Sequence, residues 1–180
     1  IVYEDNNLLV TSFPLFHRVP CVGYRFDEKP KKRHINGEAA KFYNVPVYMM
    51  ESIREGADFT CADGRVIPNA WLTTDADATK SYAYCSDTMF DTRVADAVRE
   101  ADVLYHEATY GDERAQHAAP RGHSTARQAG EIAKLAGAGN LVIGHYSKTI
   151  ADEAMLAAEA AETFGRPVIA AREGLQIDLI

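Results

Sequence analysis

The sequence lacks a long apolar run, and this absence excludes a membrane-spanning helix. No stretch of its 180 residues approaches the roughly 20 consecutive apolar residues that a helix needs to cross a bilayer. The amino end also lacks a basic segment followed by an apolar one, so no signal peptide is predicted. With 47% hydrophobic and 25% charged residues, the chain has the composition of a water-soluble globular domain.

Cysteine is scarce. Cys21, Cys61 and Cys85 are far apart in the sequence, and no two of them form a Cys-x-x-Cys pair. An odd, scattered set of cysteines argues against a disulfide framework and is typical of a reducing compartment. We therefore expect a cytoplasmic protein in which the cysteines act as small hydrophobic side chains.

An excess of positive charge is also absent. The formal net charge is -7, which excludes a surface that is basic throughout, as many nucleic-acid-binding domains have. The one local exception is the segment "EKPKKRH", in which Lys31, Lys32 and Arg33 are consecutive. From this run alone, a phosphate-binding patch and a solvated loop are equally acceptable interpretations.

The residues that are present predict an α/β fold. Strands are expected at residues 7–13 and 21–26, and from Ser81 onward strands and helices alternate. The later strands are predicted at 81–86, 102–108, 140–145, 167–170 and 175–180, and the helices at 91–101, 125–137 and 151–164. This alternation predicts helices packed on a sheet.

Residues 27–70 differ from the rest and predict an inserted arm. Proline and glycine separate two short helical stretches at 38–43 and 48–54. The segment "ADGRV" at 62–66 has the composition of a hairpin turn.

Three predicted strands end in ionisable side chains, namely Asp87, the pair His106 and Glu107, and His145. Taken singly, each has an ordinary explanation, because an Asp after a strand often caps the next helix and a His is often a buried structural residue. Taken together they would lie at one sheet edge, where α/β folds bind their ligands. Imidazole and carboxylate groups are ligands for divalent metal ions. No Gly-x-Ser-x-Gly or phosphate-binding Gly-x-x-x-x-Gly-Lys motif is present, so metal-activated water is the expected nucleophile.

A further histidine, His123, stands directly before a predicted helix in "RGHSTARQAG". Thr125 and Gln128 have the spacing of a capping box, and small apolar residues follow at helical intervals. We expect the start of this helix to hold His123 in a fixed place.

Five segments carry a resemblance to a known family. In order they are "TSFPLFHRVPCVGYRFDEK", "SDT", "HEATY", "RGHSTARQAG" and "IGHYS". Their order and spacing resemble those of ribonuclease Z, the tRNA 3′-processing endonuclease of the metallo-β-lactamase superfamily. The resemblance implies that residues 1–180 are the C-terminal half of an αββα sandwich, with the arm at 27–70 as a tRNA-binding exosite.

The resemblance also implies roles for individual residues. His17 and His145 match ligands of two different zinc ions, and Asp87 matches the carboxylate that bridges them. Glu107 matches an acid that orients His123, the imidazole that protonates the leaving 3′ oxygen or steadies the scissile phosphate. Ser147 matches a position near that phosphate, and Lys31, Lys32 and Arg33 would contact tRNA through the arm. The other histidines, His34, His106 and His117, are expected to be structural or surface residues.

The family motif His-x-His-x-Asp-His, which supplies the remaining ligands, is absent from these residues, and the chain begins at Ile1 without a methionine. We therefore expect a fragment whose N-terminal half is missing, from a homodimeric zinc-dependent endoribonuclease that cuts precursor tRNA and leaves a 3′ hydroxyl. Within the arm, "NVPVYMMESI" stands where many relatives have a Gly-Pro pair, and "KTI" follows Ser147 where they have Arg-Tyr. Two alternatives remain open: a phosphodiesterase of small substrates in the same superfamily, and a metal-free tRNA-binding fragment.

Overall fold

The computed structural model describes residues 1–179, which form two compact units. The first, the sheet unit, comprises residues 1–28 and the chain from Lys80 onward. The second, the inserted unit, is Lys29–Thr79. It therefore begins two residues after the expected start of the arm and ends nine residues after its expected end. The added residues include β7 (Thr73–Thr74), which pairs with β4 (His34–Ile35) and closes the inserted unit.

The sheet unit is built on one seven-stranded sheet in the order β1-β2-β3-β8-β9-β10-β11. Its strands are β1 (Tyr3–Glu4), β2 (Leu8–Leu15), β3 (Cys21–Glu28), β8 (Ser81–Cys85), β9 (Val103–Glu107), β10 (Asn140–Gly144) and β11 (Val168–Ala170). The pairs from β1 to β8 are antiparallel, and those from β8 to β11 are parallel. Parallel neighbours need crossover connections, and the helices predicted from the sequence supply them.

The helices of this unit are α4 (Arg93–Ala97), the 3-10 helix η2 (Asp112–His117), α5 (Ala118–Arg121), α6 (Ala126–Ala136) and α7 (Glu153–Phe164). In α4 the predicted helix is shortened, because the chain turns after Val98 and Glu100 takes a left-handed conformation with φ of 55°. The capping box of α6 is confirmed: Thr125 and Gln128 exchange side-chain and backbone hydrogen bonds. No helix in residues 1–179 is long and apolar enough to cross a membrane.

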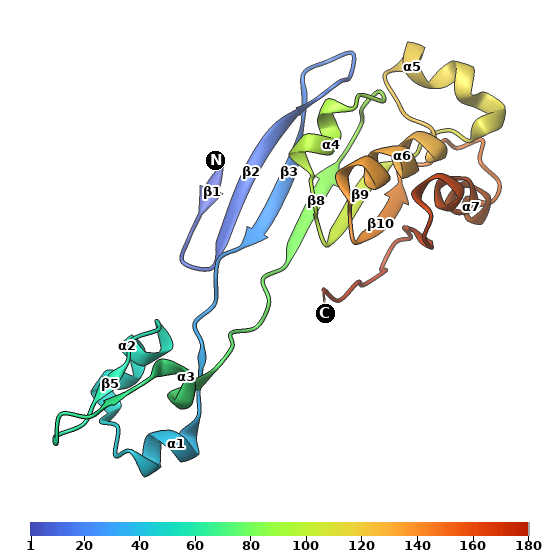
Figure 1. Cartoon of the computed structure of the whole chain (residues 1–180). Helices are drawn as coiled ribbons and strands as arrows, with labels where there is room; N and C mark the ends of the chain where they lie inside the picture. Colours follow the sequence, from blue (N-terminus) through green and yellow to red (C-terminus); the bar gives the residue numbers. More distant parts are fainter. Residues whose placement is uncertain (180) are drawn as a thin grey trace. The chain divides into compact units, whose positions relative to one another are not determined.

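One face of the sheet packs against α4, α6 and α7 (Figure 1). Ala83, Cys85 and Leu104 point to this side and are fully buried. The small residues of α6 allow close packing between helices: a Cβ at Gly130 would clash with the carbonyl oxygen of Ala160 in α7. The main core therefore lies between the sheet and these helices.

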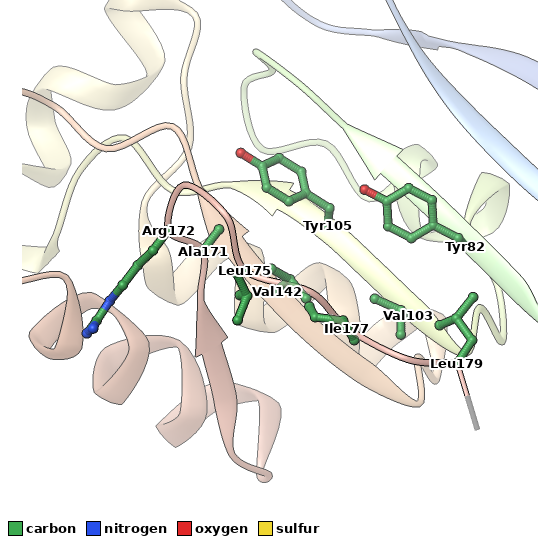
Figure 2. Close-up of a pocket in the computed structure, with 9 residues that line it drawn as sticks. All are labelled: Tyr82, Val103, Tyr105, Val142, Ala171, Arg172, Leu175, Ile177 and Leu179. Carbon is green, nitrogen blue, oxygen red and sulfur yellow. The ribbon is translucent and has the colours of Figure 1, made fainter.

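The opposite face carries large apolar side chains from the central strands, including Tyr82, Val103 and Tyr105. Residues 171–179 run across it, and Figure 2 shows Leu175, Ile177 and Leu179 beside side chains of the strands, around a groove of about 390 Å³. Partial burial there raises the pKa of both tyrosines to about 12. The strand expected at 175–180 does not form among the described residues, because this segment lies over the face of the sheet and not beside an edge strand. Ile180 lies outside the described residues.

The inserted unit has its own small core. It contains α1 (Gly37–Phe42), the 3-10 helix η1 (Val47–Met49), α2 (Met50–Arg54), α3 (Asn69–Leu72) and the antiparallel pair β5 (Phe59–Thr60) and β6 (Val66–Ile67). The predicted helices at 38–43 and 48–54 and the turn at 62–66 are confirmed within a residue or two. Their buried residues are Ala40, Val45, Ile53, Phe59, Ile67 and Leu72.

Candidate metal centre and its buried carboxylate

The topology of the sheet brings four loops to one edge. Strands β8, β9 and β10 are parallel, so their carboxyl ends lie together. Strand β2 runs in the same direction as β8, because two antiparallel pairings through β3 separate them. The residues that follow these four strand ends are therefore neighbours although up to 128 positions separate His17 from His145 in the sequence.

At this edge the structure brings together the polar residues singled out in the sequence. The Nε2 atom of His145 lies 3.2 Å from Oδ1 of Asp87. Ligand atoms of His17, Asp87 and His123 all lie within 4.8 Å of one another. The rings of His17 and His123 have centroids 5.1 Å apart, and those of His123 and His145 are stacked at 5.3 Å. The three imidazoles thus surround Asp87.

Glu107 is the buried acceptor behind this cluster. Its side chain is fully buried, and it accepts four hydrogen bonds. Oε1 accepts from the backbone N–H of Thr88 at 3.0 Å and from Nδ1 of His123 at 2.8 Å. Oε2 accepts from the backbone N–H of Thr109 at 3.0 Å and from its hydroxyl at 2.6 Å. A buried carboxylate is costly unless it is hydrogen-bonded, and here every acceptor position is used.

Each imidazole of the cluster has its Nδ1 atom occupied by a protein partner. Nδ1 of His17 lies 2.7 Å from the carbonyl oxygen of Gly122, which can only accept, so this nitrogen donates. Nδ1 of His123 donates to Glu107. Nδ1 of His145 lies 2.9 Å from the hydroxyl of Thr109. The Nε2 atoms are thus the ones left for a metal ion, and outer hydrogen bonds of this kind are typical of metal-ligating histidines. The imidazoles of His17 and His145 and the Asp87 carboxylate are donors that fit zinc-like ions.

Two backbone features place these rings. His145 has φ of 60°, a left-handed conformation that is rare for a residue with a side chain and is found mainly where function requires it. Gly122 has φ of 82°, and a Cβ there would come within 2.5 Å of Nδ1 of His17. Only glycine therefore lets the Gly122 carbonyl approach this ring.

Sequence reasoning missed two buried residues that connect the loops, Thr88 and Ser124. The Thr88 hydroxyl accepts from the backbone N–H of Phe16, next to His17, at 3.0 Å. The Ser124 hydroxyl, next to His123, donates to the Thr88 carbonyl at 2.7 Å. Thr88 directly follows Asp87 in the motif "SDT", and Ser124 directly follows His123 in "HST". Their position next to predicted site residues could have indicated that they support the site.

The other histidines lie outside the cluster. His106 is fully buried among core residues, and its Nδ1 donates to the carbonyl of Glu107 at 2.7 Å. Burial lowers the pKa of its imidazole, and Nε2 has no hydrogen-bond partner in the described part of the chain. His34 and His117 are exposed.

Ser147 follows His145 on the loop after β10. Its backbone N–H donates to the carbonyl of Thr109 at 3.1 Å, and its hydroxyl lies 2.9 Å from that of Thr149. The side chain is thus near the cluster in sequence, and within residues 1–179 it makes no hydrogen bond to the three imidazoles or Asp87.

The three basic residues predicted to bind substrate lie in the inserted unit. Lys32 pairs with Glu51 and with Glu55, and Arg33 pairs with Asp75 at 2.8 Å. The unit as a whole has seven Lys and Arg and seven Asp and Glu, so its formal net charge is zero. The cations of this local run are therefore balanced by carboxylates of the same unit, and their contact with a substrate stays a prediction. Lys31 also interacts within the chain.

The inserted unit instead exposes large apolar side chains. Phe42, Val47, Tyr48 and Trp71 are 59–84% exposed. Phe42 and Tyr48 line a hollow of about 650 Å³ within this unit, together with polar residues such as Arg65. Aromatic side chains at this exposure are common at binding surfaces.

Comparison of sequences reveals close relatives of this chain. It is 48% identical over 179 residues to a ribonuclease Z from Porphyromonas gingivalis and 49% identical over 179 residues to one from Parabacteroides distasonis. Both alignments cover 99% of this chain and 59% of the relative, so the chain spans less than two thirds of their length. No family model matches the sequence. The chain is homologous to ribonuclease Z throughout its matched length.

Comparison of structures identifies the fold. The metallo-β-lactamase fold protein YhfI from Bacillus subtilis matches with a TM-score of 0.62 and 19% identity, over 96% of this chain and 50% of YhfI. The short form of human tRNase Z matches with a TM-score of 0.58 and 22% identity, over 99% of this chain and 46% of that protein. The chain therefore has part of the metallo-β-lactamase fold.

Proposed function

We propose that this chain is the C-terminal part of a ribonuclease Z, an endoribonuclease that removes the 3′ trailer of precursor tRNA and leaves a 3′ hydroxyl on the tRNA. The observation that carries the proposal is the buried Glu107 with its hydrogen bond to His123, beside the cluster of Asp87, His17 and His145. The homology to ribonuclease Z supports the same assignment.

The enzyme would hold two zinc ions. His17 would bind one ion and His145 the other, with Asp87 shared between them. The Nδ1 hydrogen bonds support these roles, because they leave Nε2 of both rings for a metal. When bound, the ions would lower the pKa of a water molecule and stabilise charge on the phosphate.

His123 would act on the leaving group. Its Nδ1 proton is held by Glu107, so only Nε2 can give a proton to another atom. Its ring stacks on that of His145 and lies close to that of His17, which supports a position beside the scissile bond of a substrate bound at the cluster. A placed acid of this kind would protonate the 3′ oxygen as the bond breaks. The buried carboxylate keeps the imidazole from rotating.

The inserted unit would bind the tRNA. Its neutral net charge and its exposed Phe42, Tyr48 and Trp71 favour contacts by apolar and aromatic side chains in addition to the phosphate contacts of Lys31, Lys32 and Arg33. Ser147 would lie near the scissile phosphate.

The complete enzyme would also contain an upstream part. That part would supply the motif His-x-His-x-Asp-His, the remaining metal ligands and a second sheet for the apolar face along which residues 171–179 run. On this proposal the 180-residue chain is inactive alone, and the complete enzyme works as a cytoplasmic homodimer.

Two alternatives use different parts of the chain. A phosphodiesterase of small substrates would use the same metal cluster but would not need the inserted unit. A metal-free tRNA-binding fragment would use the inserted unit but not the cluster. The presence of both the cluster and the inserted unit within one chain favours the tRNA endonuclease.

The test uses the full-length enzyme that contains this chain. Precursor tRNA is incubated with the wild-type enzyme, Asp87→Asn and the control His117→Asn, which changes an exposed histidine outside the cluster. We expect the wild type and the control to release the trailer and leave a 3′ hydroxyl that poly(A) polymerase can extend, and Asp87→Asn to be inactive. Full cleavage by Asp87→Asn, or a 3′ phosphate on the product, would contradict the proposal.

A further inference from the structure

Thr109 connects two residues of the site that do not touch each other. It follows β9 and is 94% buried, since its relative exposure is 6%. Its hydroxyl lies 2.6 Å from Oε2 of Glu107 and 2.9 Å from Nδ1 of His145. Its backbone N–H also donates to Glu107, at 3.0 Å. Within residues 1–179 the Thr109 hydroxyl is therefore the only group within hydrogen-bond distance of both the buried carboxylate and this imidazole.

The direction of the protons follows from counting them. A threonine hydroxyl has one proton, and a carboxylate accepts but does not donate. All four groups around the Glu107 carboxylate donate to it, so the hydroxyl proton of Thr109 points to Oε2. The hydroxyl oxygen can then only accept from Nδ1 of His145. That nitrogen must carry a proton, and Nε2 of the same ring faces Asp87, 3.2 Å away.

We propose that Thr109 is a positioning residue. Its hydroxyl donates to the Glu107 carboxylate, which also binds His123, and thereby keeps the proton of the His145 ring on Nδ1. Glu107 thereby fixes the proton on two imidazoles, one directly through Oε1 and the other through Thr109 and Oε2. Both rings keep Nε2 directed to the cluster. The consequence for zinc binding and cleavage rests on the proposed function, whereas the proton arrangement does not.

The chemistry of the side chain explains the choice of threonine. Valine has nearly the same shape but no hydroxyl, so Thr109→Val removes the bridge and keeps the backbone hydrogen bond to Glu107. The His145 ring would then be free to carry its proton on Nε2 and donate it to Asp87. That tautomer has no lone pair left for a metal on the side of the cluster. Serine keeps the hydroxyl, so Thr109→Ser should retain the wild-type arrangement.

Thr88 offers a matched control. It is also a buried threonine beside the cluster. Its hydroxyl bonds to the backbone of Phe16 and Met89, and not to Glu107 or an imidazole. Its link to Glu107 runs through its backbone N–H, which valine keeps. Thr88→Val therefore removes a buried hydroxyl of the same kind without breaking the connection to His145.

The experiment reads the tautomer of His145 directly. The full-length enzyme is labelled with ¹⁵N in its histidine rings, stripped of metal and held at about pH 8.5, above the ordinary histidine pKa of about 6.5. Long-range ¹H–¹⁵N correlation spectra then report which ring nitrogen carries the proton, and loss of a signal in His145→Gln assigns it. We expect an Nδ1 proton in the wild type, Thr109→Ser and Thr88→Val, and an Nε2 proton in Thr109→Val.

Zinc affinity gives a second measurement. Loss of an outer hydrogen bond to a metal-ligating histidine weakens metal binding about 10–100-fold. We expect this loss in Thr109→Val and an affinity within about threefold of wild type in Thr109→Ser, by competition with a chelating dye. Thermal unfolding checks that each variant is folded, and Thr109→Ala, which removes the same hydroxyl, replaces Thr109→Val if the latter is not.

Two outcomes would overturn the inference. One is an unchanged His145 tautomer in folded Thr109→Val or Thr109→Ala. The other is an equal change of tautomer in Thr88→Val, which would mean that any loosening of the site has this effect. Neither measurement uses RNA, so absence of tRNA cleavage by the wild type would contradict the proposed function and leave the role of Thr109 standing.

Discussion

The hydroxyl of Ser124 donates a hydrogen bond of 2.7 Å to the backbone carbonyl of Thr88, and both residues are fully buried. Thr88 directly follows Asp87, and Ser124 directly follows His123. The bond therefore joins the loop of the carboxylate to the loop of the imidazole, although 36 residues separate the two partners.

Replacing Ser124 by alanine should destabilise the enzyme and weaken its site. The Thr88 carbonyl would be left buried without its side-chain partner, which typically costs about 1–3 kcal/mol of unfolding free energy. Urea denaturation measures this change. Ser124→Thr keeps a hydroxyl and is the matched variant, and an unfolding free energy of Ser124→Ala within about 0.3 kcal/mol of wild type would show that the bond contributes little.

His123→Ala should reduce turnover without removing metal. Loss of a positioned acid lowers the rate by a factor of about 10² to 10⁴. In the full-length enzyme we expect such a decrease in kcat on precursor tRNA, with zinc content unchanged by elemental analysis. Ligand atoms of His123, His17 and Asp87 lie within 4.8 Å of one another, so His123 is close enough to bind a metal ion itself. Loss of zinc in His123→Ala would therefore show that His123 is a ligand.

Removing the inserted unit should weaken tRNA binding and spare the chemistry. The backbone N–H of Glu28 donates to the carbonyl of Lys80 at 2.9 Å, so a short Gly-Ser linker can replace residues 29–79. We expect a higher KM for precursor tRNA and near-normal hydrolysis of bis(p-nitrophenyl) phosphate. If both activities fell together, the unit would be structural.

The inserted unit offers two kinds of side chain for binding tRNA, exposed aromatic ones and positively charged ones. Phe42→Ala with Tyr48→Ala removes exposed aromatic side chains, whereas Lys31→Ala removes a charge. We expect the aromatic pair to raise KM at any salt concentration, and Lys31→Ala to reduce the salt dependence of binding, because phosphate contacts release counterions. Filter binding at several salt concentrations distinguishes the two effects, and normal binding by both variants would exclude this surface.

His106 should make the protein less stable in acid. Burial lowers the pKa of its imidazole in the folded state below the unfolded value of about 6.5. Below pH 6.5 the unfolded chain binds a proton that the folded chain does not, so stability is greatest above this pH and decreases as the pH falls. The slope attributable to one such group is at most about 1.4 kcal/mol per pH unit.

His106→Asn tests this effect, because the amide can still donate to the Glu107 carbonyl but does not titrate. We expect a shallower loss of unfolding free energy between about pH 6.5 and 5. The exposed His117→Asn should keep the wild-type slope. An identical slope in wild type and His106→Asn would mean that other groups cause the acid sensitivity.

The 180-residue chain alone should bind zinc weakly and cleave no tRNA. Tight sites need at least three well-placed protein ligands for each ion. On the proposed assignment each ion has one histidine and a share of Asp87. Elemental analysis and a cleavage assay, before and after addition of the separately expressed upstream part, check this expectation. Stoichiometric zinc after dialysis, or cleavage by the chain alone, would contradict it.

Local sequence patterns determined the longer strands and helices of the sheet unit and several of their ends, but not the short elements β1, η2 and α5. Thr125 and Gln128 define the start of α6 because a capping box uses only neighbouring residues. The strands β8, β9 and β10 were predictable from short apolar runs between helices, and so was the placement of Asp87, Glu107 and His145 at their carboxyl ends. Among the described residues, 175–179 were predicted wrongly as part of a strand, because their alternating pattern does not specify whether a neighbouring strand is available.

Only the tertiary structure decided which of these groups touch. The direction of β2 relative to β8 places His17 at the same edge as Asp87. The spacing of residues in the sequence does not reveal the relative direction of two strands. The bridge through Thr109 and the bond from Ser124 to Thr88 depend on atoms from distant segments meeting within hydrogen-bond distance. The ion pairs of Lys32 and Arg33 likewise depend on where the chain folds back. Sequence therefore determined which residues lie at the ends of strands, whereas folding determined their partners, because hydrogen bonds and ion pairs act over a few ångströms in space and not along the chain.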